Sequence, residues 1–267
     1  MADSRLSLRI DNLQRAVNND EVAVALAVGD LIPAADRPAA GRDVVEALWR
    51  ALESDAPETT GASPREGVLA WFRDRGFGTV PVGAQTFAHS HLPSVVETSQ
   101  GLPIAVAVVL AEGLRRCGIE ARGINYPGHF LLRCETELID PLTLESVSPD
   151  TLSNDPRSFS VATTAILGMR MINNLKALHL QSGAWHEVLD LIEVQLALVD
   201  ESDGEALATL HYERAELWQR LGAPAIARQA LLDCLAGAPP PKLAAVARGV
   251  LDKLSAAGNG NGPQTFH

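Results

Sequence analysis

The chain has 267 residues, 46% of them hydrophobic, which is enough for two domains or one large domain with a substantial core. Its formal net charge of −11, without any basic cluster, argues against nucleic acids and anionic membranes as partners, because binding to either rests on Lys and Arg. Three scattered cysteines, no signal-peptide pattern and no apolar run longer than about ten residues predict a cytoplasmic protein without disulfides or membrane spans.

The first 90 residues are predicted to form short helices separated by Pro and Gly. Asn19 or Asp20 can cap a helix over residues 22–28, and residues 43–52 place their large apolar side chains on one face. Residues 63–66, Ser-Pro-Arg-Glu, resemble a capping box that opens a further helix.

Two histidines follow in the sequence Ala-His89-Ser-His91, and together with His129 they could form a three-histidine metal site. The short His-x-His pattern is common, however, and no acidic residues that would orient such ligands stand nearby. The Gly-rich residues 78–83 lack the Lys of a phosphate loop. We therefore expect neither a metal nor another cofactor.

Residues 102–111 are apolar at every position, which is typical of a helix buried inside a domain. A buried strand is the alternative, because Val and Ile are abundant. Pro103 suits the first turn of a helix, and the pattern continues to residue 117, which is too long for one strand. Arg115, Arg116 and Gly118 then supply residues that helix ends prefer.

A small antiparallel sheet is predicted next, from alternation in residues 119–125 and 130–134 and from a third strand that ends at Asp140. If the loop between the last two strands has an even number of residues, His129 faces Leu142. Asp140 then lies diagonally from His129, roughly 7–8 Å away between Cα atoms. A carboxylate there would fix the imidazole tautomer and make the ring more basic. An odd loop would put the two side chains on opposite faces.

From residue 148 onward, turn-like sequences give way to helices. Gly183 and Gly222 each end a helix and stand 39 residues apart (222 − 183), close to the tetratricopeptide period of about 34. Two copies are too few for a free-standing solenoid, so they should pack on the core domain. Residues 257–267 are rich in Gly and Asn and are expected to be disordered. The predicted helices are residues 166–180, 185–198, 206–221, 224–235 and 242–254.

Four segments in this order carry a resemblance: Leu-Pro-Ser-Val-Val-Glu at 92–97, Gly-Leu-Pro-Ile at 101–104, Tyr-Pro-Gly-His-Phe at 126–130 and Leu-Ile-Asp-Pro at 138–141. Together they resemble the SirB-type transglutaminase-like family. The resemblance implies an α+β, mostly helical fold, in which a transglutaminase- and papain-like core packs a buried helix on a small antiparallel sheet. It implies a core with its helical N-terminal region at residues 1–160, tetratricopeptide-like hairpins at 161–256 and a tail at 257–267.

Active members of the wider fold place a Cys at the start of the central helix, and here that position falls on Pro103. His129 and Asp140 would then be a vestigial catalytic dyad. Cys117 is at the far end of the helix, roughly 21 Å from Pro103 at 1.5 Å per residue. Cys134 alternates onto the face opposite His129, and Cys234 belongs to the later helices, so no thiol replaces the missing one.

The resemblance and this departure from it imply a non-catalytic protein that binds a protein or peptide partner. The alternative is a hydrolase or acyl transferase in which His129 is the base and Asp140 orients it, with Thr98, Ser99, bound water or a His-bound metal supplying the nucleophile. Under either function, the residues expected at the cleft are His89, His91, Thr98, Ser99 and Tyr126.

Overall fold

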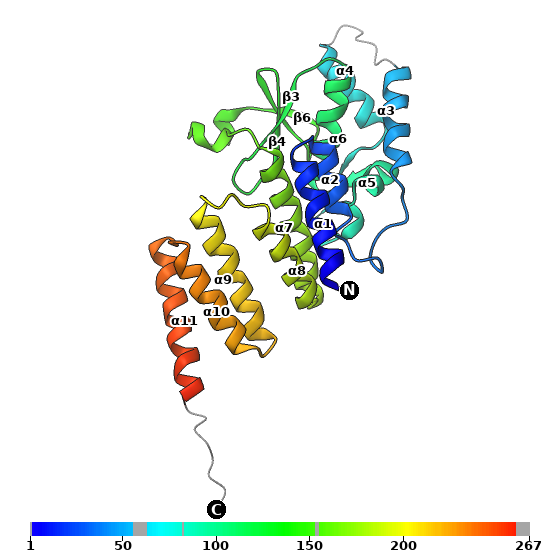
Figure 1. The fold of residues 1–267 in the computed structure, drawn as a ribbon. Coiled ribbons are helices and arrows are strands. Elements are labelled where there is room, and N and C mark those ends of the chain that lie inside the picture. The colour runs from blue at the N-terminus through cyan, green and yellow to red at the C-terminus, as the bar shows by residue number, and fades with distance from the viewer. Residues whose placement is uncertain (1, 56–62, 82, 153–154, 260–267) are drawn as a thin grey trace, which may run out of the picture. The chain divides into compact units, whose positions relative to one another are not determined.

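The computed structural model describes residues 2–55, 63–81, 83–152 and 155–259. The chain divides into two compact units, residues 1–178 and 179–267. The first unit combines helices with a small sheet, and the described part of the second consists of helices and their connections (Figure 1). This mostly helical α+β arrangement confirms the expected fold class.

Capping residues begin two early helices as the sequence predicts. The Asp20 side chain accepts a hydrogen bond from the Ala23 N–H at 2.7 Å and caps α2, while Ser63 Oγ accepts one from the Glu66 N–H at 3.3 Å and caps α4. The helices of this part are α1 (Ala2–Val17), α2 (Glu21–Gly29), α3 (Asp43–Asp55), α4 (Pro64–Asp74) and α5 (Leu92–Thr98), with a 3₁₀ turn, η1, at Phe87–His89.

The helix at the centre of the first unit is α6 (Pro103–Arg116), which packs against α2 to α5 and against the sheet. Every side chain of residues 104–111 is at most 5% exposed, so the prediction of a buried helix is confirmed. Gly113 allows close packing, because a Cβ there would lie 2.6 Å from the ring of Phe72 in α4.

The main sheet is antiparallel, in the order β3 (Ala121–Ile124), β4 (Leu131–Cys134), β5 (Glu137–Asp140) and β6 (Glu145–Val147). Cys134 is paired with Glu137, which confirms the even loop on which the diagonal placement of His129 and Asp140 depends. Strand β6 was not expected, because it is short and exposed and shows no alternation. A second, parallel pair joins β1 (Gly78–Thr79) to β2 (Gln100–Gly101), and both strands are too short to show a period.

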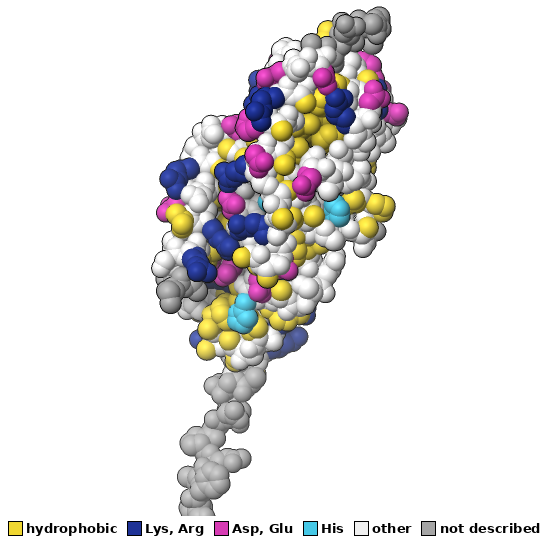
Figure 2. Space-filling model, turned by 90° about the vertical axis from the view of Figure 1, so that its right-hand side faces the viewer, with side chains coloured by type: hydrophobic (Ala, Val, Ile, Leu, Met, Phe, Trp, Pro, Cys, Tyr) yellow, Lys and Arg dark blue, Asp and Glu magenta, His cyan; other side chains and the backbone are white. Residues whose placement is uncertain are grey.

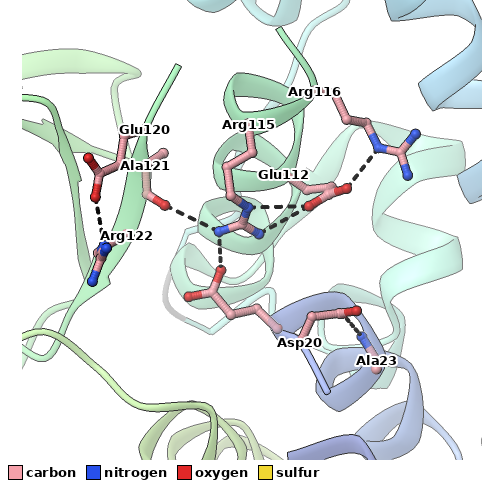
Figure 3. A network of polar contacts seen from close by, with 9 residues as sticks. Asp20, Ala23, Glu112, Arg115, Arg116, Glu120, Ala121 and Arg122 are labelled. Atoms are coloured by element: carbon pink, nitrogen blue, oxygen red, sulfur yellow. Dashed lines mark hydrogen bonds and ion pairs between the residues drawn. The ribbon is translucent and has the colours of Figure 1, made fainter. Parts of the chain in front are cut away.

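A network of charges fixes the C-terminal end of α6 to its neighbours (Figure 3). The Arg115 guanidinium donates to the Glu21 carboxylate at 2.7 Å, to the Ala121 carbonyl at 3.2 Å and to Glu112 at 3.1 Å. Glu112 also accepts a hydrogen bond from Arg116 at 2.8 Å. The C-terminal end of α6 is thereby tied to α2 and to β3.

Helix α7 (Thr164–Ser182) starts in the first unit, where the Thr164 hydroxyl donates to the Val17 carbonyl at 2.6 Å. The division between the units falls inside α7, whereas the sequence placed a boundary after residue 160. Two 3₁₀ turns, η2 (Pro149–Thr151) and η3 (Pro156–Phe159), precede it.

The second unit contains α8 (Trp185–Leu196), α9 (Gly204–Arg220), α10 (Pro224–Ala236) and α11 (Pro241–Asn259). Small side chains dominate its buried centre, where α9, α10 and α11 meet. Arg214 of α9 bridges Glu193 of α8 and Asp233 of α10. Helix α11 runs three residues into the predicted tail, whose remaining residues, 260–267, lie outside the described residues.

Charged side chains of both signs lie interspersed on the face of the molecule that Figure 2 presents, with apolar side chains between them. The described helices include none that is long and apolar enough to cross a membrane.

Candidate functional site

The candidate site is built around the turn that joins β3 to β4. Gly128 adopts a left-handed conformation with φ of 72°, which glycine tolerates without strain. The His129 N–H donates to the Tyr126 carbonyl at 3.1 Å and closes the turn. The imidazole is therefore carried by a short, hydrogen-bonded turn directly before strand β4.

His129 and Asp140 are brought together as the register predicts. The Nε2 atom of His129 lies 2.9 Å from Oδ1 of Asp140, and the two side chains are 23% and 21% exposed. The same carboxylate oxygen accepts a hydrogen bond from the Leu142 N–H at 2.8 Å, which orients it. Because a carboxylate accepts, this contact places the proton of a neutral imidazole on Nε2 and leaves a lone pair on Nδ1.

A cavity of about 140 Å³ opens beside this pair, with room for roughly four to five water molecules at about 30 Å³ each. Pro103, the first residue of α6, lines the cavity together with His129, so the position where a nucleophile was expected does face the imidazole's cavity. None of the described lining residues carries a thiol, a hydroxyl or a carboxylate. These residues are Pro103, Ile104, Gly128, His129, Phe130, Arg170 and Asn174.

Arg170, in α7, is a cavity residue that the sequence did not single out. Its Nη1 atom donates to Asn125 Oδ1 at 2.8 Å and to the Tyr126 carbonyl at 3.0 Å, and its guanidinium carbon lies 5.5 Å from the centre of the Phe130 ring. Burial lowers the pKa of Arg170. No motif marks this residue, because it stands about 40 residues after His129 in an ordinary helical pattern, and only the fold brings the two together.

The side chains of the other residues expected at the cleft have local roles outside this cavity. Thr98 Oγ1 donates to the Ser94 carbonyl at 2.8 Å, and Ser99 ends α5 in a left-handed conformation. The Tyr126 ring packs on Phe159 at 5.5 Å within an apolar cluster beneath the sheet. None of the three is among the residues that line the cavity.

The two histidines before α5 also make local contacts. His89 Nδ1 accepts a hydrogen bond from the Thr86 N–H at 2.9 Å, and His91 Nδ1 lies 2.9 Å from the Ser94 hydroxyl. Burial lowers the pKa of both rings, and the positive charge of nearby Arg37 adds to this effect at His91. Among the described residues, no three His, Cys, Asp or Glu side chains are arranged to hold a metal ion, so His89, His91 and His129 do not form the alternative three-histidine site.

All three thiols are disfavoured as thiolates. Cys134 is fully buried in β4, and burial raises its pKa to about 11. Burial raises the pKa of Cys117, with a further contribution from the charge of Glu53, and burial also raises that of Cys234 in α10. None of these cysteines lines the cavity that contains His129.

Residues 42–158 match the model of the transglutaminase-like superfamily, a range that includes α6, the sheet and the His129–Asp140 pair. This stretch is therefore similar to transglutaminase-like domains. The chain is 28% identical over 205 residues to the UPF0162 protein PA3419 of Pseudomonas aeruginosa, covering 70% of this chain and 73% of that relative. It is 27% identical over 155 residues to a UPF0162 protein of Xylella fastidiosa strain 9a5c, covering 51% of this chain and 55% of that relative. No solved structure matches the chain.

Proposed function

We propose that this protein is a non-catalytic, degenerate transglutaminase-like protein that binds a protein or peptide segment at the cavity between α6 and the His129 turn. The observation that carries the proposal is the composition of that cavity. It keeps an imidazole oriented by a carboxylate, and its described lining residues supply no thiol or hydroxyl. One of them is Pro103, which takes the position of the nucleophile of active members if the family resemblance holds.

Covalent acyl chemistry needs a nucleophile within hydrogen-bond reach of the base that activates it. Proline has no such group, and a thiol that reacts at neutral pH needs a depressed pKa. The pKa values of Cys117, Cys134 and Cys234 are instead raised. The remaining chemistry of the cavity, hydrogen-bond donors beside apolar surfaces, is the kind that holds a ligand in one orientation.

Selection from a random peptide library tests the proposal. We expect enriched peptides to bind the full chain saturably and to lose at least about tenfold in affinity on His129→Ala, because the imidazole is one of the polar groups that line the cavity. His186→Ala is the matched control, since His186 is exposed on α8 in the other unit. Equal binding to the parent and His129→Ala, with both variants folded by circular dichroism, would contradict the proposal.

Hydrolysis by an activated water molecule is the second candidate, and the orientation of His129 favours it. With Nε2 held by Asp140, the free Nδ1 lone pair could take a proton from water as the resulting hydroxide attacks a carbonyl. Cleavage of library peptides by the parent, detected by mass spectrometry and abolished by His129→Ala, would establish this candidate in place of the first.

We also propose that the second unit belongs to the tetratricopeptide-like helices of SirB-type proteins. Helices α9 and α10 form a hairpin around Gly222, whose φ of 72° suits the tight turn, and α11 packs on α10. Helical hairpins of this type commonly bind peptides. Selected peptides that still cross-link to residues 179–259 of His129→Ala would assign binding to this unit.

A further inference from the structure

Arg170 carries a positive charge that no described carboxylate neutralises. Its two hydrogen bonds go to neutral acceptors, Asn125 Oδ1 and the Tyr126 carbonyl, and both use Nη1. By contrast, Arg115 and Arg214, which are also partly buried, each bridge two carboxylates. The Nη2 and Nε donors of Arg170 have no partner among the described residues. Burial without a counter-ion lowers the pKa of Arg170, so the charged form is disfavoured by its surroundings.

The surroundings of this guanidinium supply further donors. Asn174 follows Arg170 by one helical turn on the same side of α7, lines the same cavity, and its amide has no hydrogen-bond partner among the described residues. His129 lines the cavity from the facing turn. Helix α6 begins at the cavity wall, and its N-cap, Leu102, has no side chain that could satisfy the first N–H groups, which adds partial positive charge.

We infer that this cavity binds a carboxylate group, with the Arg170 guanidinium as its anchor and the Asn174 amide beside it. A planar guanidinium with two free donors matches a carboxylate in a two-point arrangement. The inference rests on the proposed function, because it identifies which part of a peptide would enter the cavity: its C-terminal carboxylate.

The size and remaining lining of the cavity support this assignment. About 140 Å³ holds a carboxylate and one small side chain, but not a bulky group. Pro103, Ile104 and Phe130 offer apolar surface to that side chain, and no described lining residue carries a negative charge that would repel the anion. A peptide that ends in a small apolar residue fits these features.

The test uses the full chain and follows the Arg170 Nε–H signal by ¹⁵N NMR during titration. The probes are acetyl-tetra-alanine with a free carboxylate, the same peptide with a C-terminal amide, sodium acetate and sodium phosphate. We expect the free-acid peptide to shift the signal saturably, and the amide to bind at least about tenfold more weakly, because it lacks the charged acceptor. Arg170→Lys should weaken binding by a similar factor, because Lys keeps the positive charge but lacks the planar pair of N–H donors.

Arg122→Ala is the control, because Arg122 is an exposed arginine on β3 whose loss should leave binding unchanged. Equal affinity for the acid and amide forms overturns the inference. The absence of a saturable shift with any carboxylate up to about 50 mM also overturns it, because binding would then be weaker than about 2 kcal/mol. Phosphate binding tighter than either carboxylate also overturns it, in favour of a phosphate site.

The two proposals fail separately in these measurements. If library-selected peptides bind in a His129-dependent way but ignore C-terminal amidation and Arg170→Lys, the carboxylate inference fails and peptide binding stands. If acetate binds through Arg170 as tightly as the free-acid peptide does, the carboxylate site stands, and its ligand is a small free acid. The proposal that the cavity binds a peptide then fails.

Discussion

Replacement of Pro103 by cysteine tests whether this position is where a nucleophile would stand. Pro103 is the first residue of α6 and shares the cavity with His129, whose Nδ1 is not used by Asp140. A thiol introduced by Pro103→Cys would therefore meet both an imidazole and a helix N-terminus, and each of these lowers the pKa of a thiol. Proline is replaced at a position without an intrahelical N–H bond, so α6 should persist.

The expected rate follows from the thiolate fraction. An unperturbed thiol of pKa about 8.5 is roughly 0.3% thiolate at pH 6, while a pKa of about 5.5, within the range of such sites, gives roughly 75%. The thiolate fraction rises roughly 240-fold. The rate constant of each thiolate falls roughly 20-fold, because nucleophilicity decreases as the pKa decreases. The net expectation is alkylation about tenfold faster than that of an ordinary thiol at pH 6.

Peptide-level mass spectrometry after timed iodoacetamide treatment measures this rate, with Cys117 in the same molecules as the internal reference. The double variant Pro103→Cys with His129→Ala should lose most of the acceleration. If the introduced thiol reacts no faster than Cys117, or if its rate ignores His129, then Pro103 does not occupy a nucleophile position and the interpretation of the cavity as a vestigial active site is refuted.

Two further substitutions, each paired with a control variant, test the packing that positions the site by urea unfolding monitored by fluorescence. Arg115→Ala should lower the free energy of unfolding by about 2 kcal/mol, because it removes hydrogen bonds between charged groups. Its control, Arg122→Ala, removes an exposed ion pair and should lower the free energy of unfolding by less than about 0.5 kcal/mol. Equal effects of the two variants would contradict the role of the network. Gly123→Ala should cost about 1–3 kcal/mol, because the new Cβ would lie 2.6 Å from the buried Phe130 ring. Its control, Gly249→Ala, adds a Cβ in open space on α11 and should instead stabilise the protein by up to about 1 kcal/mol. Destabilisation by both glycine substitutions would point to a cause other than the contact with the Phe130 ring.

The buried helix and the dyad could be predicted from sequence because each rests on a strong local signal. The apolar run of α6 admits few other placements, and the polar break after Cys134 fixes the strand register that brings Asp140 next to His129. Asp20 and Ser63 likewise identify helix starts through short-range hydrogen bonds. In each case the determining contacts join residues close together in the chain.

The cavity itself could not be predicted, because its composition depends on α7. Arg170 and Asn174 reach His129 only through the packing of a helix that follows three strands and two 3₁₀ turns later, and nothing in their local sequence distinguishes them from surface residues. Strand β6 was missed for a related reason: its three residues are stabilised by pairing with β5 and not by an apolar face of their own.

Whether a working thiol is absent beside His129 is tested most directly by the alkylation rate of each native cysteine between pH 6 and 9. It should be measured in the parent and in His129→Ala. Because burial raises their pKa values, that of Cys134 to about 11, we expect Cys117, Cys134 and Cys234 to react slowly at pH 6. Rates should rise with pH and be equal in both proteins, because no thiol contacts the imidazole. A single cysteine that reacts rapidly at pH 6 and slows when His129 is removed would instead identify a thiol enzyme.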